Sequence, residues 1–253
     1  MTTTLQDTAR TALACLDLTS LNDGDTPEDI ARLCARAVGP HGRVAAVCVW
    51  PRFAAQARAL LPREVAVAAV ANFPDGGSDV ARAVRDTGQI VQAGAQEVDV
   101  VLPYRDLDHA PALLAAVRQA CRGLKLKVIL ETGELADEAL IRRACRIALD
   151  AGADFLKTST GKTQVSATLP AARLLLEAIA ADPQARTRVG FKPAGGIRTV
   201  ADAAAYIELT RQMLGSVTPE RLRIGASGLL NDIEAVLGGG GAAPGTTATP
   251  TSY

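Results

Sequence analysis

Short apolar runs alternate along the chain with longer segments in which apolar residues recur at helical spacing. One such helical stripe consists of Ile30, Leu33, Cys34 and Ala37. Proline or glycine stands where several of these helices are expected to begin or end, as at Pro27, Pro51 and Gly152. We expect eight strands, at Ala14–Leu18, Val44–Val49, Val65–Ala71, Glu97–Leu102, Leu126–Glu131, Asp154–Thr158, Arg188–Lys192 and Arg223–Ala226.

Eight strands alternating with helices predict a single-domain α/β fold, the closed (β/α)8 TIM barrel. An open doubly wound sheet is the alternative, but no Gly-x-Gly-x-x-Gly motif follows the first strand. We assign the barrel to residues 1–237. Residues 238–253 are rich in Gly, Thr and Pro without apolar periodicity, so we expect a flexible tail that ends in Tyr253.

Composition and charge narrow the class of protein. Hydrophobic residues make up 48% of the chain and aromatic residues 3%, which suits a parallel sheet covered by alanine-rich helices. The 27 basic and 27 acidic residues balance, so nothing indicates a nucleic-acid or membrane partner. The five cysteines lack disulfide-framework or metal-site spacing and are expected to be reduced. Without a visible signal peptide or a membrane-length apolar run, we expect a cytoplasmic protein.

Four charged residues stand inside or at the ends of apolar strands. Asp17 and Asp99 belong to the first and fourth predicted strands, and Lys157 and Lys192 to the sixth and seventh. Any one of them alone is explained as well by a structural salt bridge or by a charge that reaches water. Since (β/α)8 enzymes carry their sites at the C-terminal ends of the strands, the four together predict an active site.

The two lysines lie on neighbouring strands, so their ammonium groups are expected to be close. A Schiff base requires a neutral amine, whereas a free lysine has a pKa of about 10.4 and is protonated at pH 7. Desolvation and a nearby cation both lower a lysine pKa. We therefore expect Lys157 to be a nucleophile whose charge is suppressed by burial and by Lys192. Asp99 and Asp17 would then serve proton transfer and hydroxyl binding.

Glycine-rich segments follow the last three predicted strands and indicate a phosphate site. Small residues let backbone N–H groups approach an anion, and barrels often bind phosphate in the loops after strands 7 and 8. Each segment taken alone is equally a plain turn. The segments are Gly161-Lys162, Gly195-Gly196 and Gly225-Ala226-Ser227-Gly228.

Other chemistries find less support. The Gly161-Lys162-Thr163 tripeptide is not part of a P-loop, because Leu156 stands where that motif needs glycine. The chain has only two histidines, His41 and His109, which we place on the surface, so we expect no metal site and no cofactor. Cys48 is interpreted as a buried, apolar-like thiol or, alternatively, as a pocket-lining residue.

Seven segments in order carry a resemblance that spans almost the whole chain. They are LDLTSL (16–21), CVWPRF (48–53), EVDVVLPYRDL (97–107), LKVILETGEL (126–135), AGADFLKTSTGK (151–162), GFKPAGGIRT (190–199) and RIGASGLL (223–230). With these segments the chain resembles the 2-deoxyribose-5-phosphate aldolase family, which consists of Schiff-base aldolases with a (β/α)8 fold. The combination of KTSTGK and FKPAGG is highly specific.

The resemblance implies a reversible retro-aldol reaction in deoxyribonucleoside catabolism. Deoxyribose 5-phosphate would give glyceraldehyde 3-phosphate and acetaldehyde, without a metal or cofactor. It implies that Lys157 forms the Schiff base, Lys192 perturbs it and Asp99 belongs to the proton relay. Substrate-positioning and pocket residues implied in the same way are Asp17, Lys162, Thr19, Leu21 and Cys48. The implied phosphate-binding residues are Gly161, Gly195, Gly196, Gly225, Ser227 and Gly228.

The chain also departs from the family pattern. Gly228 stands where close relatives often have a second serine, so one hydroxyl contact to phosphate is expected to be missing. Trp50 stands where tyrosine is expected. Tyr253 ends the chain as a terminal tyrosine does in some members, where it assists proton transfer; a plain disordered end is the equal alternative. If Tyr253 acts in catalysis, its removal should lower turnover more than it raises KM.

Two rival functions stay open at the level of sequence. One is another Schiff-base phosphosugar lyase, such as a transaldolase-like enzyme. The other is a barrel that binds a sugar phosphate without turning it over. In each case the partners are small molecules, and since relatives of this type are often dimers, we expect a homodimer.

Overall fold

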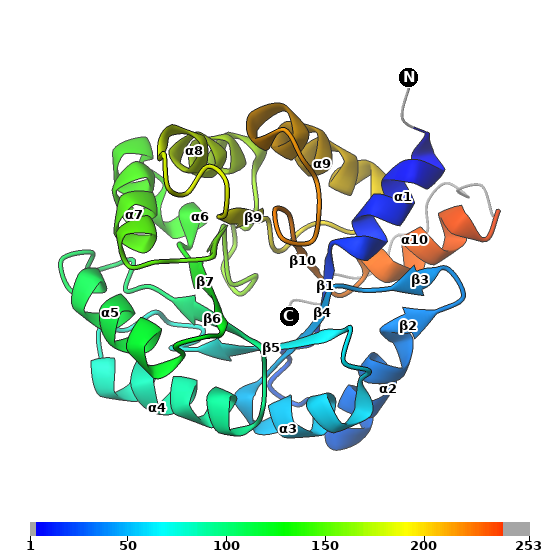
Figure 1. Ribbon diagram of the computed structural model, residues 1–253, viewed down its shortest axis with the longest axis horizontal. Helices are drawn as coiled ribbons and strands as arrows, with labels where there is room; N and C mark the ends of the chain where they lie inside the picture. The colour runs from blue at the N-terminus through cyan, green and yellow to red at the C-terminus, as the bar shows by residue number, and fades with distance from the viewer. Residues whose placement is uncertain (1–3, 240–253) are drawn as a thin grey trace.

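The computed structural model describes residues 4–239, in which eight parallel strands form one sheet that curls into a barrel (Figure 1). The strand order is β10-β1-β4-β5-β6-β7-β8-β9. The strands are β1 (Leu16–Thr19), β4 (Ala46–Val49), β5 (Ala66–Ala71), β6 (Glu97–Val101), β7 (Lys125–Ile129), β8 (Phe155–Lys157), β9 (Gly190–Lys192) and β10 (Ile224–Ala226). Bridges between Phe191 and Leu222 and between Ala194 and Gly225 join β9 to β10 and close the barrel. The predicted (β/α)8 fold is therefore confirmed.

At least one helix follows each barrel strand, and the helices surround the sheet (Figure 1). They are α2 (Pro27–Arg36), α3 (Pro51–Leu60), α4 (Val80–Gln92), α5 (Ala110–Ala120), α6 (Thr132–Leu135), α7 (Glu138–Asp150), α8 (Leu169–Ala181), α9 (Val200–Leu214) and α10 (Leu229–Leu237). The parallel strands thus return through helical crossovers, which place all their C-terminal ends at one face of the barrel.

Local sequence explains where the helices begin. Helix α2 has a capping box, in which Thr26 and Asp29 exchange side-chain and backbone hydrogen bonds, and Pro27 occupies its first turn. Thr199 and Asp202 form the same arrangement at α9. Each box satisfies backbone N–H groups that otherwise have no partner at a helix N-terminus.

The barrel core is built from small and branched apolar residues. Every residue of β1, β4 and β6 is buried, and the AVAAVA sequence of β5 is buried beyond its first residue. Strands covered on both faces need such continuous apolar sequence. The exceptions are charged residues that point into the barrel, and these residues make up the candidate site.

The structure contains three elements that the sequence pattern did not suggest. Helix α1 (Leu5–Ala14) precedes the barrel and packs against α9 and α10. A two-stranded hairpin, β2 (Val38–Gly39) with β3 (Gly42–Arg43), lies between α2 and β4, and α6 has only four residues. Residues 240–253, with Tyr253, lie outside the described residues, so the tail stays a prediction.

Candidate active site

Lys157 and Lys192 are the last residues of β8 and β9 and lie opposite each other in the strand pairing. Both amines contact the same oxygen, Oδ2 of Asp99, at 2.9 Å from Lys157 Nζ and 2.7 Å from Lys192 Nζ. Their side chains are 3% and 0% exposed. The structure thus brings the two lysines together inside the barrel, as the strand order led us to expect.

Asp17 and Asp99 lie within β1 and β6, before the strand ends, whereas the two lysines are the last residues of their strands. Both carboxylates are fully buried, and Oδ2 of Asp17 accepts a hydrogen bond from Lys192 Nζ at 2.5 Å. Side chains that point into a barrel stack in layers, so residues below the strand ends reach the same centre as long lysines above them.

Three further charged residues complete the site, and sequence reasoning missed all of them. Lys127 Nζ lies 2.6 Å from both Asp99 Oδ1 and Glu97 Oε2. Arg223 donates to Asp17 Oδ1 and to Glu97 Oε1, each at 2.7 Å. Charged residues in apolar strands were the available signal, but Glu97 and Lys127 stand before the strand ends at which a barrel site is expected. We call the seven residues the ion cluster: Asp17, Glu97, Asp99, Lys127, Lys157, Lys192 and Arg223.

The charges of the ion cluster balance only when one cation is neutral. Three carboxylates face four basic groups, and a buried excess charge is costly. Lys127 contacts three carboxylates, whereas Lys192 and Arg223 contact two each. Among the described residues, the one carboxylate that Lys157 contacts is Asp99, through an oxygen that it shares with Lys192. Lys157 is therefore the basic group whose neutral form costs least.

The pKa shifts within the cluster follow this pattern. Burial lowers the pKa of Lys157 below its ordinary value, and Lys192 adds to this effect while Asp99 opposes it. Burial also disfavours the charge of Lys192, but Asp17 and Asp99 outweigh it and raise the pKa. For Lys127, three carboxylates overcome the same burial and raise the pKa further. The amine that is most easily neutral is thus the one predicted to be the nucleophile.

The hydroxyl groups after β8 fasten this loop to neighbouring strands. Ser159 Oγ donates to the carbonyl of Ala194 at 2.7 Å, and the Ala194 amide donates to Thr158 Oγ1 at 3.1 Å. These bonds tie the loop that follows Lys157 to the loop that follows Lys192. The loops after β8 and β9 are therefore held together beside the two lysines.

Glu131, just after β7, fixes the next part of the same loop and was not predicted as a site residue. Its buried carboxylate accepts bonds from Thr160 Oγ1 at 2.5 Å and from the Thr160 amide at 3.2 Å. Thr163 Oγ1 adds a bond at 3.3 Å. Glu131 has a left-handed backbone with φ of 53°, a strained conformation that often accompanies functional sites. The loop that carries Gly161 and Lys162 is thus held by one carboxylate.

Gly195 and Gly225 permit neighbouring backbone segments to approach each other closely. A Cβ on Gly195 would lie 2.5 Å from Ser166 Oγ and 3.2 Å from Cα of Gly161. A Cβ on Gly225 would lie 2.9 Å from Cβ of Ala194 and 3.2 Å from Cε of Lys192. The glycines thus allow the β8, β9 and β10 loops to meet beside Lys192.

The predicted phosphate loops differ in the backbone groups that they offer. Gly225 lies within β10, and its amide donates to the Pro193 carbonyl at 2.9 Å, which corrects our placement of it in the loop. The Gly195 amide donates to the Gly225 carbonyl at 3.3 Å. For the amides of Gly196, Ser227 and Gly228, residues 4–239 supply no hydrogen-bond acceptor. These exposed residues stand before α9 and α10, where N–H groups favour an anion.

The other predicted pocket residues differ in their burial. Thr19 in β1 donates to the carbonyl of Asp17, and Leu21 is buried just after this strand. Cys48 is fully buried in β4, and burial raises the pKa of its thiol, as expected for an apolar-like cysteine. Lys162 is half-buried in the loop after β8. All five cysteines lie in the described part of the chain, and all are free and buried.

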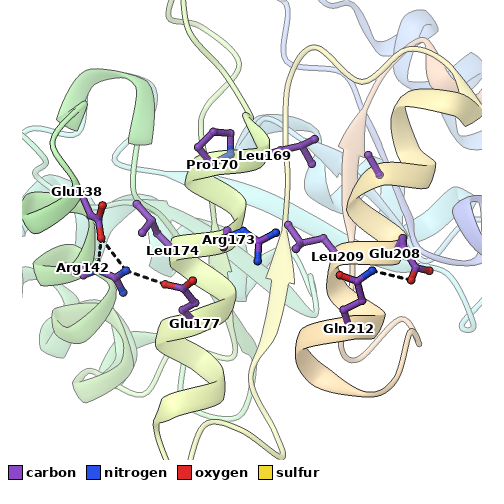
Figure 2. Close-up of a pocket in the computed structure, with 11 residues that line it drawn as sticks. Glu138, Arg142, Leu169, Pro170, Arg173, Leu174, Glu177, Glu208, Leu209 and Gln212 are labelled. Atoms are coloured by element: carbon purple, nitrogen blue, oxygen red, sulfur yellow. Dashed lines mark hydrogen bonds and ion pairs between the residues drawn. The ribbon is translucent and has the colours of Figure 1, made fainter.

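A large groove on the outer surface lies away from this chemistry (Figure 2). It measures about 660 Å³ and runs between α7, α8 and α9. Its walls carry the ion pairs that Arg142 makes with Glu138 and Glu177. No member of the ion cluster lines it, so we place the active site inside the barrel and not in this groove.

Residues 4–239 contain no group of three or more His, Cys, Asp and Glu residues arranged to hold a metal ion. Within the same range, no helix is both long and apolar enough to cross a membrane. The two histidines, His41 and His109, are exposed, as predicted.

Comparisons with known proteins identify the family of the chain. Residues 11–233 match the profile of the DeoC/LacD family aldolases. A deoxyribose-phosphate aldolase from Agrobacterium fabrum is 49% identical over 245 residues, which cover 93% of each chain. A structure from Toxoplasma gondii ME49, described provisionally as a deoxyribose-phosphate aldolase, has a TM-score of 0.83 at 26% identity and covers 93% of this chain and 97% of that one. The aldolase QR15 has a TM-score of 0.76 at 27% identity, over 90% and 96% of the two chains.

The matched residues run from before β1 to within α10 and therefore include every barrel strand and both strand-end lysines. This extent is far more than half of the chain. The protein belongs to the DeoC/LacD family of aldolases.

Proposed function

We propose that the protein is a deoxyribose-phosphate aldolase that uses Lys157 as its Schiff-base nucleophile. It would cleave 2-deoxy-D-ribose 5-phosphate reversibly to D-glyceraldehyde 3-phosphate and acetaldehyde, in deoxyribonucleoside catabolism. The observation that carries this proposal is the buried amine of Lys157, which has one carboxylate contact in a cluster that balances without its charge. The relative from Agrobacterium fabrum, which bears this name, supports the choice of substrate.

The proposed retro-aldol reaction begins at the amine of Lys157. Its neutral amine adds to the aldehyde carbon of the open-chain sugar, and loss of water gives the Schiff base. The C2–C3 bond then breaks, its electron pair moves into the protonated imine, and the C3 hydroxyl loses a proton. Protonation of the resulting enamine at C2 and addition of water release acetaldehyde and restore the amine.

Asp99 is the proposed proton carrier beside the amine. Its Oδ2 lies 2.9 Å from Lys157 Nζ. Burial favours the neutral acid, but Lys127, Lys157 and Lys192 outweigh it and hold the pKa of Asp99 well below its ordinary value. A carboxylate of this kind is ionised and holds a proton only transiently. We propose that Asp99 relays protons between the amine and its surroundings.

Asp17 has a proposed role that its contacts refine. Both of its oxygens are engaged, Oδ2 with Lys192 and Oδ1 with Arg223. This arrangement supports an indirect role, in which Asp17 orients Lys192 beside the nucleophile. A direct contact with a substrate hydroxyl would have to share these oxygens.

The anionic end of the substrate is proposed to bind where the loops after β8, β9 and β10 meet. Lys162 supplies a positive charge, and the amides of Gly196, Ser227 and Gly228 supply donors. Gly195 and Gly225 are proposed to shape the loops by permitting close packing, and Gly161 by its positive φ of 82°. Thr19, Leu21 and Cys48 would complete the wall around the reacting carbons.

The direct test is to trap the intermediate with borohydride. Incubation with 2-deoxyribose 5-phosphate and borohydride should add mass to Lys157, found by peptide mapping, and should abolish activity. Lys162, five residues away, serves as the internal control and should stay unmodified. Mass at another lysine, or full activity of Lys157→Leu, would contradict the proposal.

The two rival functions predict different results in the same assay. Another Schiff-base phosphosugar lyase would still be trapped at Lys157 but would not accept acetaldehyde as the donor in the synthetic direction. A sugar-phosphate-binding barrel without catalysis would bind the ligand and leave Lys157 unmodified.

We also propose a cytoplasmic homodimer, which rests on the family and not on contacts in this chain. A structural relative at 24% identity, from Aeropyrum pernix, is described as tetrameric, so assembly is to be measured directly. Light scattering of the purified protein should give twice the 26.2 kDa mass of the chain. A mass equal to one or four chains would replace the dimer.

A further inference from the structure

Arg223 and Glu97, the members of the ion cluster nearest the beginning of the strands, form a charge pair that the proposed chemistry does not use. Arg223 donates two hydrogen bonds to Glu97, at 2.7 Å and 3.0 Å. Both side chains are at most 5% exposed. Neither residue contacts Lys157 in the described structure. Both line a hollow of about 570 Å³ that also includes Lys125 and Glu220 and opens at the end of the barrel where the strands begin.

This pair is linked to Lys157 through shared partners. Arg223 also binds Asp17, which binds Lys192. Glu97 also binds Lys127, which binds Asp99. Since Lys192 and Asp99 are the groups next to the Lys157 amine, the chain of ion pairs runs from one end of the barrel to the other.

Within residues 4–239, Asp99 is the one carboxylate that pairs with the Lys157 amine. Strand β5 contributes no titratable residue. Glu131, after β7, is a carboxyl group whose pKa burial raises, and it binds the loop hydroxyls. The titratable groups on the strands around Lys157 and on their flanks, whether next to its amine or linked to it through shared partners, are Asp17, Cys48, Glu97, Asp99, Lys127, Glu131, Lys192 and Arg223.

We propose that Arg223 is a positioning residue that keeps the Lys157 amine neutral, and that it does so by completing the balance of three carboxylates and three cations with Glu97. It touches neither substrate nor nucleophile. The inference deepens the proposed Schiff-base function and rests on it.

The balance makes a signed prediction for loss of the Arg223 charge. In Arg223→Gln, three carboxylates would face only Lys127 and Lys192, and protonation of Lys157 would restore neutrality. The pKa of Lys157 should then rise. In the double variant Glu97→Gln/Arg223→Gln, two carboxylates face two cations, so Lys157 should again be neutral at lower pH.

The experiment is the pH dependence of kcat/KM for 2-deoxyribose 5-phosphate. The acid limb reports the group that must lose a proton, here Lys157. We expect Arg223→Gln to move this limb up by about one pH unit, the usual size of shifts caused by charges inside proteins. On the acid limb this equals about tenfold lower kcat/KM. The double variant should return to the parental limb.

A charge-conserving control separates this effect from packing. Arg223→Lys keeps the cation and should leave the acid limb in place, even if it lowers stability. A merely structural role predicts instead that the double variant is worse than the single one. Thermal melts of each variant verify folding before the pH profiles are measured.

Each possible pH profile of the Arg223 variants either supports or contradicts the proposed role of Arg223. An unmoved limb in Arg223→Gln, or a double variant whose limb stays displaced, overturns it. If Arg223→Gln does not fold, a folded double variant with the parental limb supports the charge balance. A double variant that does not fold overturns it, because loss of both charges should be tolerated. Failure of the proposed function is distinguishable, since Lys157 of the parent would then not be trapped by borohydride.

Discussion

Lys127 and Lys157 lie on the adjacent strands β7 and β8 and are both buried, yet their surroundings favour opposite charge states. Lys127 contacts three carboxylates, which outweigh its burial and raise its pKa. Lys157 contacts one carboxylate oxygen, which another lysine shares, and burial lowers its pKa. Burial alone therefore does not make a lysine neutral. The number of carboxylates that contact its amine decides its charge.

The comparison also separates two functions of the barrel interior. Towards the beginning of the strands, charges are paired several times over and hold the strands together. Towards the strand ends, one cation is left without a carboxylate of its own, and we propose that the reactivity of Lys157 follows from this deficit. On this proposal the same seven residues serve both structure and chemistry.

The largest expected effect is the loss of catalysis in Lys157→Met. Without the amine no Schiff base forms, and kcat should fall by at least about 10⁴-fold, as when other covalent nucleophiles are removed. Stability should be unchanged or improved, because the remaining cluster is balanced and the new side chain is apolar. Steady-state assays and urea unfolding measure the two effects.

A large loss of stability in Lys157→Met would break the comparison. It would mean that Lys157 is a charged structural partner like Lys127, and that the three carboxylates need all four cations.

The opposite result is expected for Lys127→Met. Removal of this cation leaves buried carboxylates without their partner, which costs about 3–5 kcal/mol of unfolding free energy. Urea unfolding at pH 7 measures the loss, with Lys157→Met as the matched variant of the same size. Equal stabilities of the two variants would show that the lysines do not differ in charge.

A smaller effect is expected where the backbone makes room for Lys192. A methyl group on Gly225 would crowd Cβ of Ala194 at 2.9 Å and Cε of Lys192 at 3.2 Å. Gly225→Ala should cost about 1–3 kcal/mol of stability, the usual cost of overpacking, and should lower kcat by displacing Lys192. Gly228→Ala is the control, because no atom of residues 4–239 lies within 4 Å of its added methyl group. Similar losses in both variants would argue against a special role of position 225.

The smallest effect is predicted for the loop that Glu131 holds. Glu131→Gln would turn an amide donor towards the Thr160 N–H or lose one of its bonds, at a cost of about 0.5–1.5 kcal/mol. Because this loop carries Lys162, KM should rise about three- to tenfold while kcat changes less. Glu134→Gln, on the exposed face of α6, should leave KM unchanged. A fall in kcat without a change in KM would place Glu131 in the chemistry instead.

Much of this arrangement could be predicted from sequence because the barrel imposes order. The apolar runs gave all eight strands, and strand order alone placed Lys157 beside Lys192. The lower cluster was not predicted, since Glu97 and Arg223 are 126 positions apart and nothing local indicates that they meet. The role of Glu131 was equally hidden, because its left-handed backbone and its bonds to Thr160 depend on how β7 and β8 pack.

The loops show a second limit of sequence reasoning. Glycines at 161, 195, 196 and 225 all look like phosphate-binding positions in the sequence. In the fold, the amides of Gly195 and Gly225 are already bonded to backbone carbonyls, and the described residues leave those of Gly196, Ser227 and Gly228 for an anion. Sequence alone cannot distinguish a glycine whose amide donates to a ligand from a glycine that lets two backbone segments pack closely.

The central claim is that the amine of Lys157 loses its proton more readily than that of an ordinary lysine, and its own titration tests this most directly. The rate at which an amine reagent labels Lys157 can be followed by mass spectrometry across pH, with N-acetyl-lysine as the reference. We expect half-maximal reactivity at a pH below the ordinary lysine pKa of about 10.4, because burial and Lys192 together lower the pKa. Titration of Lys157 at or above about 10.4 would contradict the account.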